Sequence, residues 1–218
     1  EMISPDSDLY REHPDWAIHI DEREGVQSRN QMVLDLSRDE VCEYVINAVS
    51  DILANANIEY VKWDMNRQLT DMPRLGYNHE YTLGYYKIMS AITEKFPNIL
   101  FEGCSAGGGR FDAGVLAYMP QIWTSDNSDA IARLKMQYST SMCYPVYSIS
   151  SHVTASPNHQ CGRVTSLKTR ADVAYCGTFG YELDVTKMSD EEFEEIKAQI
   201  EFEKRIQDLM CDGDLYRL

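Results

Sequence analysis

The sequence predicts an α/β fold, and specifically an incomplete (β/α)8 TIM barrel that contains only later strands and helices. Short runs rich in β-branched and aromatic residues alternate with amphipathic segments, so the strands are expected to be parallel. A complete barrel needs about 250 residues and eight units, whereas these 218 residues supply about five units. A doubly wound sheet is the other architecture that this alternation allows.

The expected elements follow one another without a Gly/Ser-rich linker or an internal repeat. The expected strands are 58–63, 99–102, 121–124, 145–150 and 178–183. The expected helices are 38–56, 79–95, 128–140, 163–175 and 189–209, after an opening loop. Ser-x-x-Glu capping boxes at Ser37 and Ser189 begin two of the helices, and Ser128 is expected to cap a third. Residues 1–218 are therefore interpreted as one truncated domain, the C-terminal portion of a barrel.

The charge composition disfavours some classes of binding partner. Asp and Glu number 35 against 20 Lys and Arg, so the net charge of -15 disfavours nucleic acid and anionic membranes. No apolar run approaches the roughly 18 residues of a membrane helix. The six cysteines form no Cys-x-x-Cys motif. The sequence opens on Glu1–Met2 without a secretory leader, and a leader that has been cut away is the alternative. We therefore expect a cytoplasmic protein with free thiols.

The first candidate site residue follows strand 58–63. In a barrel the chemistry lies on the loops after the carboxyl ends of the strands. Alternation along the strand places Lys62 and Asp64 on the same face, and an inward lysine needs an anion beside it. We expect Asp64 to be that anion and to be kept ionised by the pair, as a glycosidase nucleophile must be. A structural ion pair at a strand end is the alternative interpretation.

A second carboxyl follows strand 121–124. Asp126 lies in the loop and could donate a proton to a leaving oxygen, whereas Asp129 fits better as a charge that stabilises a helix N-terminus. Carboxyls about 5 Å apart on neighbouring strand ends would form the arrangement of a retaining glycosidase.

Two other polar segments are less specific. Gly107–Gly109, followed by Arg110, could hold a phosphate or let the backbone bend close under a neutral sugar, and the acidic composition disfavours phosphate. His152 and His159 have no third acidic ligand at helical spacing, so we expect them to lie in a loop and to bond to the backbone or a ligand rather than to a metal.

Taken together, the motifs resemble those of one family. The segments are Ser28–Gln31, Tyr60–Arg67, Gly103–Ser105, Gly107–Asp112, Trp123–Asp126, Ser151–Val153 and Pro157–Gln160. In this order, over nearly the whole chain, they closely resemble the α-galactosidases of glycoside hydrolase family 36.

The resemblance implies a retaining exo-glycosidase that hydrolyses terminal α-galactosyl residues of raffinose-type oligosaccharides and melibiose, without a metal or organic cofactor. It implies Asp64 as the nucleophile and Asp126 as the acid/base. The substrate-binding residues that it implies are Arg29, Lys62, Asn66, Cys104 and Trp123. We expect the full-length enzyme to be a homo-oligomer.

The family pattern also includes a tandem Asp pair and a Trp on earlier strands, which this chain lacks. The chain therefore resembles a fragment that begins just after the third barrel strand. Other interpretations are an α-N-acetylgalactosaminidase or a raffinose-synthase-like galactosyl transferase on the same scaffold. A non-catalytic sugar-binding or structural fragment, and a sugar-phosphate enzyme that uses the glycine turn, are the remaining alternatives.

Overall fold

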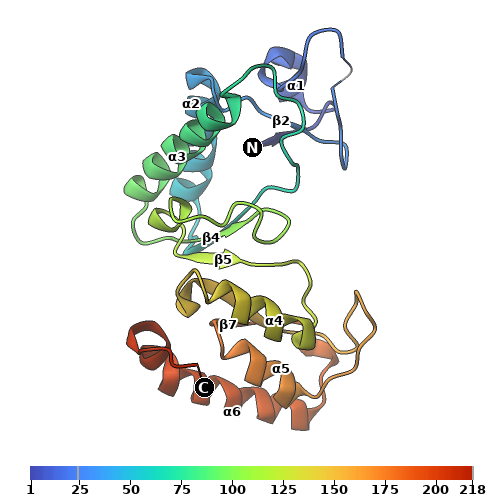
Figure 1. The fold of residues 1–218 in the computed structure, drawn as a ribbon, viewed down its shortest axis with the longest axis vertical. Coiled ribbons are helices and arrows are strands. Elements are labelled where there is room, and N and C mark those ends of the chain that lie inside the picture. Colours follow the sequence, from blue (N-terminus) through green and yellow to red (C-terminus); the bar gives the residue numbers. More distant parts are fainter. Residues whose placement is uncertain (24, 218) are drawn as a thin grey trace. The chain divides into compact units, whose positions relative to one another are not determined.

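The computed structural model describes residues 1–23 and 25–217, which form two compact units (Figure 1). The first unit comprises Glu1–Ala106 and Asp112–Pro120, and the second comprises Gly107–Phe111 and Gln121–Leu218. Each unit alternates helices with parallel strands, which confirms the predicted α/β class. In the part of the chain that is described, no helix is long and apolar enough to cross a membrane.

The first unit carries two parallel strands that bring their carboxyl ends to the same level. Its elements are β1 (Met2–Ile3), α1 (Asp8–Glu12), η1 (Pro14–Trp16), β2 (Met32–Val33), α2 (Asp39–Asn55), β3 (Tyr60–Asp64), α3 (Tyr77–Lys95), β4 (Leu100–Cys104) and η2 (Val115–Ala117). β3 pairs with β4 in parallel, and Asp64 lies opposite Cys104. The predicted opening loop contains a short antiparallel pair, because β1 pairs with β2.

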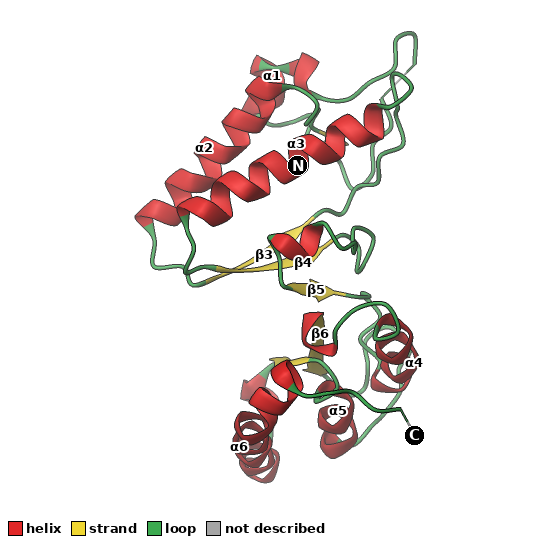
Figure 2. Ribbon diagram, turned by 60° about the vertical axis from the view of Figure 1, so that its left-hand side comes forward, coloured by secondary structure: helices red, strands yellow, loops and turns green. Residues whose placement is uncertain are grey.

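Helices α2 and α3 lie side by side (Figures 1 and 2). Their apolar residues recur at helical spacing and are buried, among them Val45 on α2 and Ile88 and Ile92 on α3. Gly84 permits a close approach at the middle of α3, because a Cβ there would lie 1.7 Å from the carbonyl oxygen of Leu36.

The start of α2 differs from the prediction. The Ser37 hydroxyl donates to Asp35 Oδ1 at 2.6 Å, and Arg38 occupies the N-cap without a side-chain cap. Glu40 instead forms an ion pair with Arg38. The predicted capping box at Ser37 is therefore wrong, because its two side chains have nearer partners.

The second unit contains the other three parallel strands. Its elements are β5 (Gln121–Trp123), α4 (Ala130–Thr140), η3 (Val146–Ser148), β6 (Ile149–Thr154), α5 (Leu167–Ala174), β7 (Thr178–Glu182), η4 (Val185–Lys187) and α6 (Asp190–Asp212). β6 pairs with β5 on one side and with β7 on the other. The strand predicted at 145–150 lies four residues further along, because Ser148 bonds to the carbonyl of Pro145 and closes a 3-10 turn.

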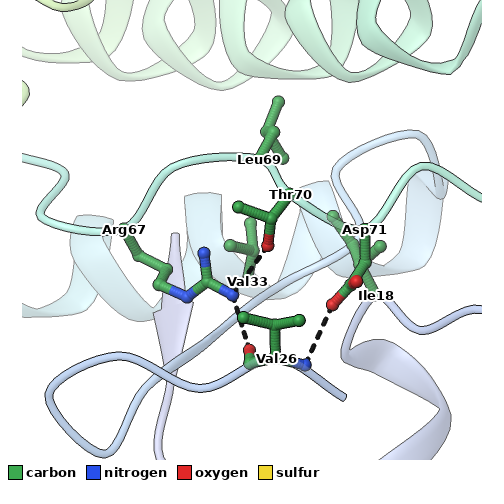
Figure 3. A pocket seen from close by; sticks show the side chains of 7 residues that line it. All are labelled: Ile18, Val26, Val33, Arg67, Leu69, Thr70 and Asp71. Atoms are coloured by element: carbon green, nitrogen blue, oxygen red, sulfur yellow. Dashed lines mark hydrogen bonds between the residues drawn. The ribbon is translucent and has the colours of Figure 1, made fainter. Parts of the chain in front are cut away.

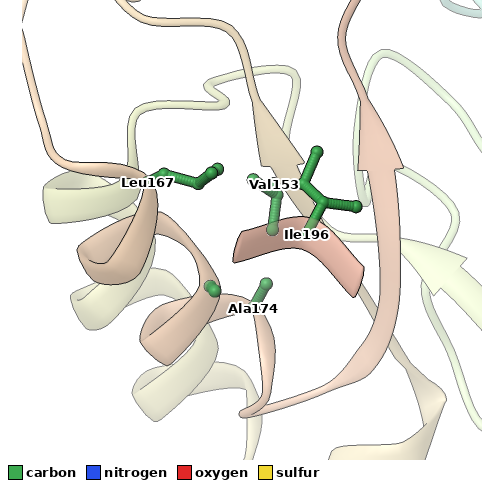
Figure 4. Packing of buried hydrophobic residues seen from close by; sticks show 5 residues of the cluster. Val153, Leu167, Ala174 and Ile196 are labelled. Atoms are coloured by element: carbon green, nitrogen blue, oxygen red, sulfur yellow. The ribbon is translucent and has the colours of Figure 1, made fainter. Parts of the chain in front are cut away.

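An apolar cluster holds the second unit together. Val153 from β6, Leu167 and Ala174 from α5, and Ile196 from α6 point toward one another (Figure 4). The capping box predicted at Ser189 is confirmed at the start of α6.

The N-cap of α4 differs from the prediction. It is Asp129 rather than Ser128, since the Asp129 carboxylate accepts from the backbone N–H of Ala132 at 2.9 Å. Asp129 thus has the helix-stabilising function expected of it, and the Ser128 hydroxyl accepts from Asn158 instead.

Candidate active site

Asp64 is the last residue of β3, so the strand fixes its backbone. Its Oδ2 accepts a hydrogen bond from Asn66 Nδ2 at 2.5 Å. Its Oδ1 is buried and makes no hydrogen bond to any described residue. One carboxylate oxygen is therefore held in place, while the other is buried and is not engaged in a hydrogen bond with a described residue.

Lys62 has a different anion from the one predicted. Its Nζ lies 3.4 Å from Glu102 Oε1, and Glu102 is fully buried. Lys62 and Glu102 are direct partners across β3 and β4, whereas Asp64 lies two residues along the strand, about 6.6 Å away. The predicted pairing of Lys62 with Asp64 is wrong, and Glu102 orients the lysine.

Glu102 also accepts a hydrogen bond from the phenol of Tyr60. Burial of the Tyr60 phenol, together with this hydrogen bond to a carboxylate, raises the pKa of Tyr60. Tyr60 therefore remains a neutral donor at physiological pH, and two residues of β3 converge on one buried carboxylate.

The segment after Asn66 is anchored by the buried Arg67 (Figure 3). Its guanidinium donates to the carbonyl of Val26 at 2.5 Å and to that of Gln31 at 3.3 Å. Asp71 accepts from the backbone N–H of Val26 at 3.1 Å. These bonds tie the chain that follows β3 to the segment that contains Arg29.

Arg29 lies at the tip of a two-residue turn. Arg29 and Asn30 have φ values of 55° and 56°, and Ser28 and Gln31 bond to each other through their backbones. Positive φ at both central residues is the geometry of a type I′ turn. The Asn30 side chain bonds to Asp6 Oδ2 at 2.8 Å, while Arg29 is exposed. The turn therefore presents the Arg29 side chain to solvent.

Cys104 ends β4 and is buried. Its carbonyl accepts from the N–H of Met65 at 3.0 Å, and the Ser105 hydroxyl donates to the carbonyl of Met65 at 3.0 Å. These bonds fasten the ends of β3 and β4 to each other, immediately beyond Asp64.

Asp126 belongs to the second unit and lies in the loop after β5, as predicted. The residue is exposed, and its carboxylate bonds to no side chain or backbone group of the described residues. Its backbone carbonyl accepts from Gln160 Nε2 at 2.7 Å. The loop thus holds the backbone of Asp126 and leaves its carboxyl group free to meet a ligand.

The glycine turn packs against this loop. Gly107 has φ +88°, and a Cβ on it would lie 2.7 Å from Ser125 Cα. The N–H of Gly108 donates to the carbonyl of Thr124 at 3.0 Å. A close backbone approach therefore accounts for these glycines, and the approach is to the protein's own Asp126 loop.

Trp123 is the buried last residue of β5. The Arg133 guanidinium lies 3.9 Å from its ring centroid, and the His152 ring stacks on it with centroids 4.6 Å apart. His152 also bonds to Glu182 at 3.2 Å. It lies in β6 rather than in a loop, and its partner is a side chain rather than the predicted backbone or ligand. Among the described residues no group of three or more His, Cys, Asp and Glu could hold a metal ion.

Sequence reasoning missed three residues that organise these segments, namely Glu102, Arg133 and Gln160. Glu102 could have been found by writing the two strands in parallel register, where it stands opposite Lys62. Arg133 carries a weaker signal, an arginine in the first turn of a helix that directly follows a strand-end loop. Gln160 lies 34 residues from Asp126, and no local pattern joins them.

The chain is similar to known proteins that are named as α-galactosidases. A family model described as Melibiase matches residues 1–213. The alpha-galactosidase AgaA of Geobacillus stearothermophilus is 53% identical over 226 residues, covering 100% of this chain and 31% of that protein. The bifunctional alpha-galactosidase/sucrose kinase AgaSK of Mediterraneibacter gnavus is 51% identical over 218 residues, covering 100% of this chain and 23% of its own length.

Solved structures match as well. A crystal structure of an AgaA variant in complex with raffinose has a TM-score of 0.96 at 53% identity, covering 100% of this chain and 32% of the other. The alpha-galactosidase of Lactobacillus brevis has a TM-score of 0.96 at 46% identity, covering 100% of this chain and 30% of the other.

These matches also confirm the predicted fold, a part of a (β/α)8 barrel. The chain spans about a third or less of the length of these relatives. Since the family model covers nearly all of the sequence, the chain belongs to the melibiase family, glycoside hydrolase family 36.

Proposed function

We propose that the protein containing this chain hydrolyses terminal α-D-galactosyl residues of oligosaccharides with retention of configuration, and that Asp64 and Asp126 carry out the chemistry. The observation that carries the proposal is the state of Asp64. One of its oxygens is held by Asn66 at 2.5 Å, and the other is buried without a hydrogen bond to a described residue. A nucleophilic carboxylate needs this combination of a fixed orientation and an oxygen whose lone pairs are not already engaged in a hydrogen bond.

In the first step Asp64 attacks the anomeric carbon, while protonated Asp126 gives its proton to the departing oxygen. A covalent galactosyl–Asp64 ester forms as the glycosidic bond breaks. In the second step Asp126 takes a proton from water, and that water attacks the anomeric carbon and releases Asp64. Two inversions leave galactose with its original α configuration.

Substrate binding is assigned to Arg29, Lys62, Asn66, Cys104 and Trp123. Lys62 is oriented by the buried Glu102, so its ammonium is a candidate donor for galactose hydroxyls. Asn66 bonds to Asp64, which supports a function in holding the nucleophile as well. AgaA variants from Geobacillus stearothermophilus have been crystallised with raffinose and with stachyose, which supports raffinose-type oligosaccharides as substrates here.

The decisive experiment traps the covalent intermediate in the full-length protein. A 2-deoxy-2-fluorogalactosyl fluoride slows the second step, so a fluorogalactosyl ester should accumulate on Asp64. Peptide mapping by mass spectrometry should locate it there, and NMR should show α-galactose as the first product from nitrophenyl α-galactoside. Labelling of another carboxylate, or β-galactose as the first product, would refute the mechanism.

Azide separates the functions of the two acids. Asp126→Ala with added azide should yield α-galactosyl azide, because azide replaces water in the second step. Asp64→Ala with azide should yield the β-azide, because azide replaces the nucleophile. The N-acetylated substrate analogue and a sugar acceptor serve as controls, since a preference for either would indicate a galactosaminidase or a transferase on this scaffold.

The cysteines support a cytoplasmic location. All six are free thiols, and Cys143, Cys161, Cys176 and Cys211 are exposed. Exposed thiols persist in a reducing compartment. We also propose that the full-length enzyme is a homo-oligomer, which light scattering of the purified protein would test.

A further inference from the structure

Arg133 connects α4 to the loop that carries Asp126. It projects from the first turn of α4 and is only 4% exposed. Its Nε donates to the carbonyl of Asn127 at 2.9 Å, and its Nη2 donates to the carbonyl of Ser125 at 2.5 Å. Its Nη1 donates to the hydroxyl of Thr124 at 2.7 Å. One guanidinium therefore binds the chain on both sides of Asp126.

The carbonyl between those two belongs to Asp126 itself, and it accepts from Gln160 at 2.7 Å. Three successive carbonyls are thus each bound by a side chain. A loop without ladder hydrogen bonds is normally mobile, because its backbone groups bond to water. Here the rigid, planar guanidinium of Arg133 supplies the hydrogen bonds that strand pairing would otherwise supply. Its face packs on the ring of Trp123 at the end of β5.

We propose that Arg133 is a positioning residue for the acid/base Asp126, an inference that rests on the proposed function. The carboxylate of Asp126 makes no hydrogen bond or ion pair with a described residue, so its placement depends on the backbone that carries it. General acid catalysis requires the carboxyl to reach hydrogen-bond distance of the leaving oxygen. A displacement of about 1 Å in such a group lowers the rate on the order of a hundredfold.

The test compares substrates that need protonation with those that do not. Raffinose has a poor leaving group and needs a proton from the acid, whereas α-galactosyl fluoride needs almost no such help. In the full-length Arg133→Ala variant, we expect kcat/KM for raffinose to fall about a hundredfold and that for the fluoride to fall less than about threefold. Arg133→Lys keeps the charge but not the planar fork, so it should retain more raffinose activity than Arg133→Ala.

Gln137 provides a matched control on the same helix. It is also buried, and it donates to the carbonyls of Val173 and Cys176, but it does not contact the Asp126 loop. Gln137→Leu should lower the melting temperature and change activity on both substrates by the same factor. Thr124→Val removes only the hydrogen bond that the Thr124 hydroxyl accepts from Arg133 Nη1. It therefore tests the proposal even where Arg133→Ala fails to fold. We expect kcat/KM to fall more for raffinose than for the fluoride, by a smaller ratio than in Arg133→Ala.

Failure of the positioning function and failure of the proposed function would give different results. Equal losses on raffinose and the fluoride in Arg133→Lys and Thr124→Val, as in Gln137→Leu, would overturn the positioning function and leave the proposed function intact. A wild-type protein that hydrolyses neither substrate would overturn the proposed function.

Discussion

The two candidate acids are supported in opposite ways. Asp64 is the terminal residue of a strand, and a neighbouring amide holds its carboxylate directly. Asp126 lies beyond its strand, and Gln160 and Arg133 hold only the backbone around it. In the first unit the side chain is fixed, whereas in the second the loop is fixed and the side chain is free to turn.

This difference matches the tasks that the proposed mechanism gives to the two acids. A nucleophile attacks one carbon along one line, so a fixed carboxylate loses little by being held. An acid/base first gives a proton to the leaving oxygen and then takes one from water, so it serves two atoms in succession. A free carboxyl on a fixed loop suits that double task.

The largest effect is expected when each acid is removed in the full-length protein. Asp64→Ala should lower kcat by about a thousandfold or more on every α-galactoside, because no substrate can bypass the nucleophile. Asp126→Ala should lower kcat/KM strongly for raffinose and much less for α-galactosyl fluoride. Steady-state kinetics on both substrates provide the measurement, and losses independent of the leaving group in both variants would remove the distinction.

A second prediction concerns the anchor of the first unit. Arg67→Met should destabilise the protein by about 3 kcal/mol, since it removes the hydrogen bonds that the buried guanidinium donates to three carbonyls, at about 1 kcal/mol each. It should also raise KM for galactosides, because the bonds to the segment that carries Arg29 are lost. Denaturant unfolding and steady-state kinetics measure the two effects.

Arg11→Met is the matched control for this prediction, because the Arg11–Asp8 ion pair is exposed. It should change stability by less than about 1 kcal/mol and leave KM unchanged. An effect of Arg67→Met no larger than that of Arg11→Met would mean that the anchor does not hold the turn.

The backbone support of Asp126 yields the third prediction. Gly107 and Gly162 both have positive φ, +88° and +68°, but only a Cβ at Gly107 would meet backbone, at Ser125 and Asp126. An alanine at either site would have to adopt a left-handed backbone conformation, which costs about 1–2 kcal/mol. Gly107→Ala should therefore lower stability by about 2 kcal/mol more than Gly162→Ala.

Gly107→Ala should also reduce raffinose hydrolysis more than fluoride hydrolysis, because it displaces the loop of Asp126. Melting curves and kinetics of the two variants provide the measurement. Similar behaviour of both alanine variants would show that the glycine turn does not support the loop.

Local patterns were sufficient to predict most of the helices and strands, but not the β1–β2 pair or the start of β6. The apolar spacing of α2 and the Ser189 capping box needed no tertiary information, and both acids were placed at strand ends as observed. The same local reasoning failed where a distant group competed. Lys62 pairs with Glu102, 40 positions later in the chain, because β4 brings that carboxylate alongside β3.

The supporting contacts were beyond sequence reasoning for the same reason. Gln160 and Arg133 donate to backbone carbonyls, and any side chain with an N–H or O–H donor can do that, so no single residue type marks the interaction in advance. Aligning β3 with β4 in parallel register could have identified Glu102 as the partner of Lys62. The anchoring of the Asp126 loop needed the three-dimensional structure.

The last and smallest prediction extends the comparison to tyrosines. Tyr77 in the first unit donates to the carboxylate of Asp35 at 2.7 Å, whereas Tyr181 in the second donates to the neutral amide of Gln199 at 2.8 Å. Burial raises the pKa of both phenols, and the bond to Asp35 raises that of Tyr77 further. Their stabilising effect is complete below about pH 10, the ordinary tyrosine pKa, and is lost as the pH rises above it, by at most about 1.4 kcal/mol per pH unit for each phenol.

Tyr77→Phe should therefore flatten the alkaline decline of the melting temperature, and Tyr181→Phe should flatten it less. Deprotonating Tyr77 would place two anions together, which costs more than deprotonating a phenol beside an amide. Asp35 keeps its bonds from Ser37 in the Tyr77→Phe variant, so the variant leaves no bare carboxylate. Melting temperatures of the three proteins from about pH 8 to 11 test this, and parallel curves would contradict it.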